Sequence, residues 1–108
     1  MNYRIVITQT AEQDIRQAVI WWRDNRSAVE AERWLNKVYP AIETLTKWPA
    51  RCPLAAENDL VPTGVRQLHF GVSPKTTHRI VFTIAEQDVV ILRVRHVARR
   101  ALTSDELH

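Results

Sequence analysis

The segment that decides the fold is HRIVFTIAEQDVVILRVRHVARR, residues 78–100. Two apolar runs, 80–84 and 89–94, flank a polar turn at residues 86–88. Both runs are rich in Val, Ile and Phe, which suit a pleated and half-buried surface. The pattern therefore predicts a β-hairpin.

The two faces of this hairpin differ in character, because successive side chains point to opposite faces of a strand. Simple alternation predicts an apolar face that carries Ile80, Phe82, Ile84, Val90, Leu92 and Val94. The opposite face then carries Arg79, Val81, Thr83, Val89, Ile91, Arg93 and Arg95. We expect helices to cover the apolar face and the three arginines to point towards solvent or a partner.

The length and composition indicate one soluble domain, residues 1–108. Hydrophobic residues make up 45% of the 108 residues and charged residues 25%, enough for a core without disulfides or metal. No apolar run approaches the roughly 18 residues that cross a bilayer, and no signal peptide is recognisable, so a cytoplasmic location is expected. Cys52 is the only cysteine, for which we expect a small buried or loop thiol. No metal and no cofactor are expected.

Positive charge is concentrated in the second half of the chain. The net charge is +3; residues 1–60 hold eight Lys or Arg and eight Asp or Glu, whereas residues 61–100 hold seven and two. Clustered charge of one sign attracts anionic partners, which include both nucleic acid and acidic proteins. Charge alone does not distinguish these two classes.

Two helices are predicted before residue 50, after a first strand at residues 3–7. Thr10 and Gln13 form a capping-box pattern, and Ser27 and Glu30 repeat it, so one helix should begin at Thr10 and the next at about residue 28. Apolar residues recur at steps of three and four in both segments, so the helices should pair as an antiparallel hairpin. Pro40 predicts a kink in a single second helix that ends near residues 47–48.

The remaining segments complete an α+β architecture. Residues 49–64 contain three prolines and no periodicity, which predicts a loop. Residues 65–70 resume strand character, and residues 97–107 form a short helix or remain irregular. The predicted order is β-α-α-β-β-β, an antiparallel-rich sheet with a helical hairpin packed on one face.

Five motifs resemble the RelE/ParE superfamily of toxins from type II toxin–antitoxin systems, and together they cover nearly the whole chain. They are YRIVIT followed by A-x-x-D-I at 11–15, residues 31–45 with Trp48-Pro49, GVRQL at 64–68, HRIVF at 78–82 and VVILRVRH at 89–96. The resemblance implies a growth-inhibiting toxin that forms a hetero-oligomer with a cognate antitoxin. RelE-like members cleave mRNA on the ribosome, whereas ParE-like members poison DNA gyrase. Neither activity requires binding to a membrane, so no membrane partner is expected.

The RelE-like reaction needs a base, a cation for the phosphorane charge and an acid for the leaving oxygen. The resemblance places Arg79 in the cationic role, because a guanidinium binds phosphate oxygens bidentately. The alternative is that Arg79 pairs with a carboxylate or with an acidic group of the antitoxin. Arg66 and Arg99 correspond to further basic positions of the RelE-like cluster. Under this interpretation His96 or His69 would have to supply the base.

Two departures favour the ParE-like branch. Leu68 stands where the RelE-like cluster has its second lysine, and no Tyr or Trp follows Trp48 to stack on a substrate base. A Trp-rich helical hairpin also fits ParE-like toxins better. The four tryptophans are expected mostly in the core, except Trp21, which lies off the main apolar stripe. Whether the protein is an enzyme stays open at this point; as a binding protein it would contact its partner through Arg79, Arg93, Arg95 and Trp21.

Overall fold

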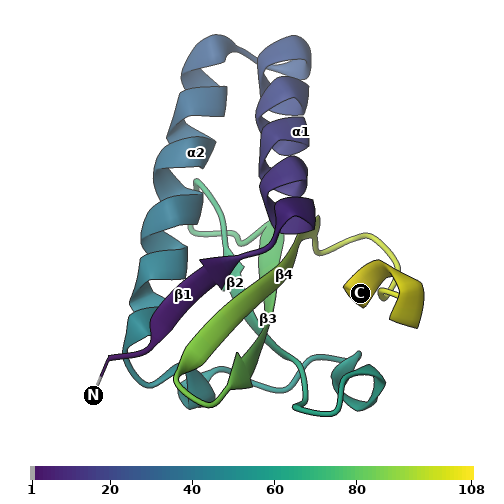
Figure 1. Ribbon diagram of the computed structural model, residues 1–108. Helices are drawn as coiled ribbons and strands as arrows, with labels where there is room; N and C mark the ends of the chain where they lie inside the picture. The colour runs from purple at the N-terminus through teal and green to yellow at the C-terminus, as the bar shows by residue number, and fades with distance from the viewer. Residues whose placement is uncertain (1) are drawn as a thin grey trace.

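The computed structural model describes residues 2–108, so Met1 of the predicted domain lies outside them. Two helices and four strands follow one another along the chain as β1 (Arg4–Ile7), α1 (Gln9–Asn25), α2 (Ala28–Glu43), β2 (Arg66–Phe70), β3 (His78–Ala85) and β4 (Asp88–His96) (Figure 1). The sheet order is β1-β4-β3-β2, with β1 parallel to β4 and the other pairs antiparallel. The predicted α+β fold is therefore confirmed.

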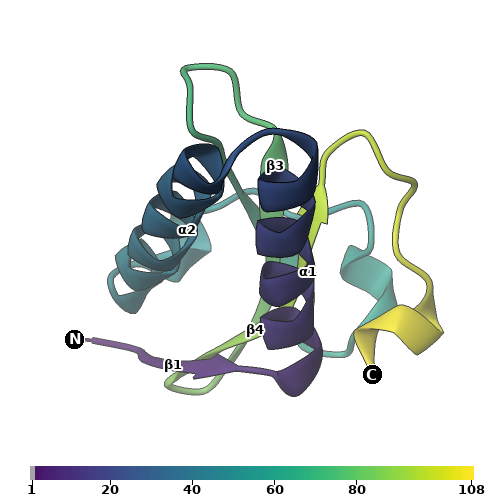
Figure 2. The same cartoon turned by 90° about the horizontal axis from the view of Figure 1, so that it is seen from above.

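The two helices lie on one face of the sheet, as Figures 1 and 2 show, with α1 over β4 and α2 over β2. The core between these layers is closed by large side chains that are almost fully buried: Ile15, Trp34, Val38, Ile42, Leu45, Ile80, Phe82 and Ile91. Among residues 2–108, no helix is both long enough and apolar enough to span a membrane.

Helix α1 begins two residues earlier than predicted. Thr8 is the N-cap, and its hydroxyl accepts the Ala11 N–H at 3.1 Å while donating to the Ile91 carbonyl at 2.8 Å. Thr10, the predicted cap, is already helical and exposed. The Thr8 hydroxyl links the helix start to β4, an advantage that no local capping pattern could indicate.

Replacing Thr8 with alanine should lower the free energy of unfolding by about 1 to 2 kcal/mol, because one N-cap bond and one link to β4 are lost. Thr10→Ala is the matched control and should change it by less than about 0.5 kcal/mol. Urea unfolding of both variants measures the difference. Equal losses in the two variants would contradict the assignment of Thr8 as the cap.

Helix α2 begins where predicted, at residue 28, but ends before the predicted residues 47–48. The Ser27 hydroxyl accepts the Glu30 N–H at 3.1 Å, and the helix passes through Pro40 as one element. It ends at Glu43, where a 3₁₀ turn at Thr44–Thr46 continues the chain. Residues 49–64 form an irregular loop with two short 3₁₀ turns, and the last predicted helix is a 3₁₀ turn at Ser104–Leu107.

A β-bulge in β4 corrects the predicted faces of the hairpin. Val81 pairs with Arg93 and Phe82 with Ile91, so Leu92 has no partner in the register. The extra residue reverses the alternation. Consequently Val89 and Ile91 face the helices together with Val94, whereas Leu92 packs on the other side.

The face opposite the helices is also covered, contrary to the prediction that it is open. A second apolar cluster forms there from the loop, the sheet and the C-terminal segment; its buried members are Ala55, Val65, Val81, Leu102 and Leu107. Figure 1 shows the C-terminal 3₁₀ turn, in yellow, beside the sheet. The arginines predicted on this face therefore lie beneath the chain's own segments.

Candidate functional site

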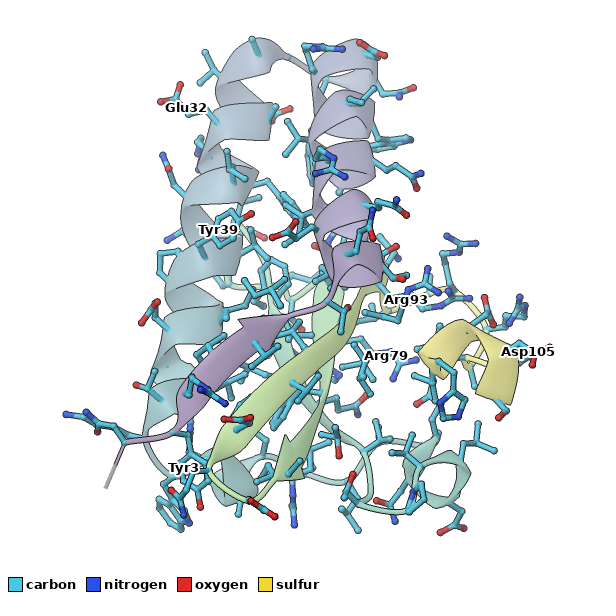
Figure 3. The ribbon with its side chains drawn as sticks, viewed as in Figure 1. Tyr3, Glu32, Tyr39, Arg79, Arg93 and Asp105 are labelled. Carbon is cyan, nitrogen blue, oxygen red and sulfur yellow. The ribbon has the colours of Figure 1, made fainter. Side chains whose placement is uncertain are left out.

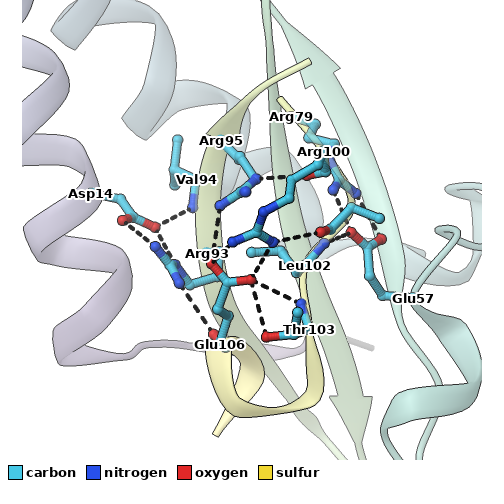
Figure 4. Close-up of polar contacts among 11 residues, drawn as sticks. Asp14, Glu57, Arg79, Arg93, Val94, Arg95, Arg100, Leu102, Thr103 and Glu106 are labelled. Carbon is cyan, nitrogen blue, oxygen red and sulfur yellow. Dashed lines mark hydrogen bonds and ion pairs between the residues drawn. The ribbon is translucent and has the colours of Figure 1, made fainter. Parts of the chain in front are cut away.

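Arg79 is buried in an ion pair with an acidic residue of the irregular loop. Its guanidinium donates to both carboxylate oxygens of Glu57, at 2.9 and 2.5 Å, and to Gln67 at 3.0 Å. Glu57 is 2% exposed and also accepts the Leu102 N–H at 2.8 Å (Figure 4). The hydrogen bond from Arg79 holds the pKa of Glu57 at about 2. Glu57 and Gln67 thus accept hydrogen bonds from the two terminal nitrogens of Arg79.

Arg93 joins the sheet to α1. It donates to both oxygens of Asp14, at 2.7 and 2.9 Å, while the Val94 N–H also binds Asp14 at 3.0 Å. This ion pair raises the pKa of Arg93. A third bond at 3.3 Å reaches the Glu106 carbonyl in the C-terminal turn, so Arg93 holds three segments together.

Arg95 is 4% exposed and has fewer partners than its neighbours. Its Nε donates to the Arg100 carbonyl at 3.1 Å, and its Nη1 lies 3.7 Å from Glu106, which is also bound to Arg100 at 2.7 Å. No acceptor among residues 2–108 binds its Nη2. Burial, and then the nearby charge of Arg99, lowers the pKa of Arg95.

The expectation that Arg79, Arg93 and Arg95 point into solvent is therefore wrong for Arg79 and Arg95, which are buried, and only partly right for Arg93. Figure 3 shows Arg79 and Arg93 beside the C-terminal segment. The three do share one face of the sheet, since Arg79 pairs with Arg95 and Val81 with Arg93. Their roles in partner binding stay predictions.

Of the remaining residues predicted for an RNA-cleaving cluster, only His69 is placed beside Arg79, as its register partner on β2. Arg66 is the register partner of Phe82 and so lies on the helix side, where it donates to the Ala50 and Cys52 carbonyls at 3.2 and 2.7 Å. His69 is exposed on the edge strand β2, on the same face as Arg79. Its ring faces the side that carries the buried ion pair.

His96 and Arg99 lie at a different place, a pocket of about 500 Å³ between α1 and the adjoining ends of β3 and β4. Both side chains are exposed, and the His96 ring meets the His78 ring edge to face at a centroid distance of 5.1 Å. Trp21 and Trp22 line the opposite side. Arg95 also lines the pocket. Trp21, Arg95, Arg99 and His96 are recognisable in the sequence for different reasons, and no sequence pattern places them together.

His78 is a pocket residue that the sequence analysis assigned no separate role. Its Nδ1 receives the Trp34 indole N–H at 3.3 Å and lies 2.9 Å from the Thr77 hydroxyl. Because an indole can only donate, Nδ1 is the acceptor and the ring proton is on Nε2. Burial, and then the charge of His96, lowers the pKa of His78 to about 4. The ring is therefore neutral at pH 7.

The lowered pKa of His78 predicts acid sensitivity. Between pH 6.5, the ordinary value, and about 4, the unfolded chain binds a proton that the folded chain excludes. The free energy of unfolding should therefore fall as the pH falls through this window, by up to about 1.4 kcal/mol per pH unit. Denaturant unfolding at several pH values measures the slope. The variant His78→Phe should lose the part of this slope that comes from His78. An unchanged slope in the variant would contradict the assignment to His78.

The four tryptophans do not all belong to the core. Trp34 is fully buried against Phe70 and His78, whereas Trp21 is 54% exposed, as its position off the stripe predicted. Trp48 is 72% exposed and has a φ of 47°, so the expectation of a core residue is wrong there. The residue before Pro49 turns the chain at this point and presents the indole to solvent.

Cys52 is buried, as predicted, and burial raises the pKa of its thiol. Across residues 2–108, no three His, Cys, Asp or Glu side chains are gathered as a metal site would require. The candidate site therefore consists of the pocket beside α1 and the internally paired arginine cluster.

Solved structures with the same fold define the class. The chain resembles the chromosomal ParDE toxin–antitoxin system from P. aeruginosa (16% identity, 88% of this chain and 96% of the other, TM-score 0.69). It also resembles the RelBE2 complex from Mycobacterium tuberculosis (22%, 89% and 99%, TM-score 0.50) and a mutant E. coli RelE in the free state (12%, 91% and 86%, TM-score 0.53). The fold is thus that of RelE/ParE toxins.

Residues 5–101 match the family of ParE toxins of type II toxin–antitoxin systems, parDE, and the chain belongs to this family. Comparison with curated protein sequences finds no match. The resemblance to the RelE/ParE superfamily and the preference for its ParE-like branch are confirmed.

Proposed function

We propose that this toxin inhibits growth by poisoning DNA gyrase, as a binding protein without chemistry of its own. Membership of the ParE family supports this target. The observation that carries the proposal is the buried ion pair between Arg79 and Glu57. Both terminal nitrogens of the guanidinium donate to the Glu57 carboxylate, so they are not free to bind a phosphate group.

The arrangement around Arg79 also speaks against the alternative, a RelE-like endoribonuclease that acts on ribosome-bound mRNA. Arg66 lies on the other face of the sheet, and His96 and Arg99 lie at the pocket beside α1. A reaction that needs a base, a cation and an acid around one phosphate requires these groups to converge. His69 is the register partner of Arg79, but Arg66, Arg99 and His96 do not join them, so the set does not converge. This favours a protein that binds its target.

A purified supercoiling assay tests the target directly. The protein is expected to inhibit gyrase and to accumulate cleaved DNA, and Arg79→Lys, if folded, should retain much of this effect. Primer extension on mRNA after induction is the companion measurement and should show no cuts at ribosomal A sites. Unimpaired gyrase together with A-site cuts that Arg79→Lys abolishes would overturn the proposal.

The partner that neutralises the toxin is proposed to be a cognate antitoxin, forming a hetero-oligomer in the cytoplasm. The structural neighbours from P. aeruginosa and M. tuberculosis are toxin–antitoxin systems, which supports this partner. The excess of Lys and Arg in residues 61–100 suits an acidic or amphipathic antitoxin segment. Co-expression with the product of the adjacent gene should restore growth and yield a co-purifying complex, and failure of every neighbouring gene product to do so would contradict it.

A further inference from the structure

The pocket beside α1 has aromatic walls and the size of a small-molecule site. Its volume of about 500 Å³ lies within the range of roughly 300 to 1,000 Å³ that is typical of ligand pockets. Trp21 and Trp22 meet at right angles, with centroids 5.4 Å apart, and form one corner. Ala18 and Val94 add apolar surface. Such a corner offers an aromatic ligand a face and an edge at once.

The polar groups opposite this corner are hydrogen-bond donors. The His78 proton is on Nε2, which binds no acceptor within residues 2–108. The His96 Nδ1 receives the Ala98 N–H at 3.0 Å, so its proton is also on Nε2. Arg99 adds a guanidinium that makes no ion pair or side-chain hydrogen bond with the described residues. Donors that line one pocket in this way suit an acceptor with negative charge.

The charge around the pocket is not balanced within the chain. Asp14 is the only carboxylate that lines the pocket among residues 2–108, and Arg93 and the Val94 N–H occupy its oxygens. The nearby Arg100 is neutralised by Glu106, whereas Arg99 has no such partner. Arg95 also lines the pocket; its Nη1 lies 3.7 Å from Glu106, and its Nη2 binds no acceptor within residues 2–108. Positive charge at the pocket therefore exceeds negative charge.

From these contacts we propose that the pocket binds a small aromatic monocarboxylate, with its ring against Trp21 and Trp22 and its carboxylate on Arg99 and the two imidazole N–H groups. A phosphate monoester is disfavoured because it carries about −1.5 to −2 charge at pH 7, and removing such an anion from water beside apolar walls costs more than removing a monocarboxylate. This proposal does not rest on the proposed gyrase target or on the proposed antitoxin.

Titration of the ¹⁵N-labelled protein with indole-3-acetate tests the site. Chemical-shift changes are expected along the pocket side of α1 and at the adjoining ends of β3 and β4. Indole-3-acetamide, which has the same ring but no charge, should bind about tenfold more weakly, as expected when one charge-assisted hydrogen bond is lost. Adenosine monophosphate tests whether the pocket prefers a phosphate group, and it should bind more weakly than indole-3-acetamide.

Two pairs of variants supply matched controls. Arg99→Ala should weaken indole-3-acetate binding about tenfold, whereas Arg100→Ala, which changes an adjacent exposed arginine outside the pocket, should leave it nearly unchanged. Trp21→Ala should weaken it similarly, and Trp48→Ala should not. Both exposed tryptophans can be changed without emptying the core. The proposal would be overturned if indole-3-acetate and indole-3-acetamide bound equally well, or if adenosine monophosphate bound more tightly than indole-3-acetate. Equal effects of the two arginine variants, or of the two tryptophan variants, would also overturn it.

Discussion

Replacing Glu57 with glutamine is expected to lower the free energy of unfolding by about 3 to 5 kcal/mol. The substitution preserves shape but leaves the Arg79 charge buried without its counter-charge, and it weakens the bond from the Leu102 N–H. A small domain has about 5 to 15 kcal/mol of stability in total, so the variant would be close to unfolding. Urea unfolding measures the loss.

Asp59→Asn is the matched control, since it removes an exposed acidic residue two positions away and should cost less than about 0.5 kcal/mol. The double variant Glu57→Leu with Arg79→Met removes both charges and should regain most of the stability, because apolar pairs often replace buried ion pairs without loss. If the double variant is no better than Glu57→Gln, the unpaired charge is not the cause of the loss.

The ion pair between Glu57 and Arg79 also makes the stability depend on pH, at lower pH than His78 does. The pKa of Glu57 is about 2 in the folded chain against an ordinary value of 4.5, so its contribution is complete above pH 4.5 and is lost as the pH falls towards 2. This window lies below that of His78. Glu57→Gln should therefore flatten the low-pH limb of the stability profile and leave the higher limb intact.

Trp34→Ala is the second change with a large expected effect, a loss of about 3 to 5 kcal/mol. The indole is fully buried against Phe70 and His78, and it donates the hydrogen bond that fixes the His78 tautomer. Trp48→Ala serves as control, because that indole is exposed and should contribute less than about 0.5 kcal/mol. Thermal unfolding of the two variants should differ widely, and similar midpoints would refute the assignment of Trp34 to the core.

The helices and the order of the elements along the chain were predictable because they follow local rules. Ser27 caps α2 as its pattern indicated, and the apolar periodicity of both helices identifies the side they bury. The prediction of Thr10 as the N-cap was wrong because the Thr8 hydroxyl also binds β4, which is distant in sequence. Long-range contacts of this kind leave no local signal.

The candidate site was less predictable for the same reason. The bulge at Leu92 has no marker in an unbroken apolar run, and it decides which side Val89 and Ile91 occupy. The burial of Arg79 depends on Glu57, which comes from a loop without periodicity. The pocket joins α1 to the ends of two strands and required the fold to be known. Its members Trp21, Arg95, Arg99 and His96 were recognisable from the sequence, but only one at a time.

The central position of β4 governs when the fold can be completed during synthesis. This last strand pairs with β1 on one side and β3 on the other, so a nascent chain that has not passed residue 88 leaves its first strand without a neighbour. Pairing between the two ends of a chain forms late and slowly. The sheet therefore cannot be completed until nearly the whole chain has been synthesised.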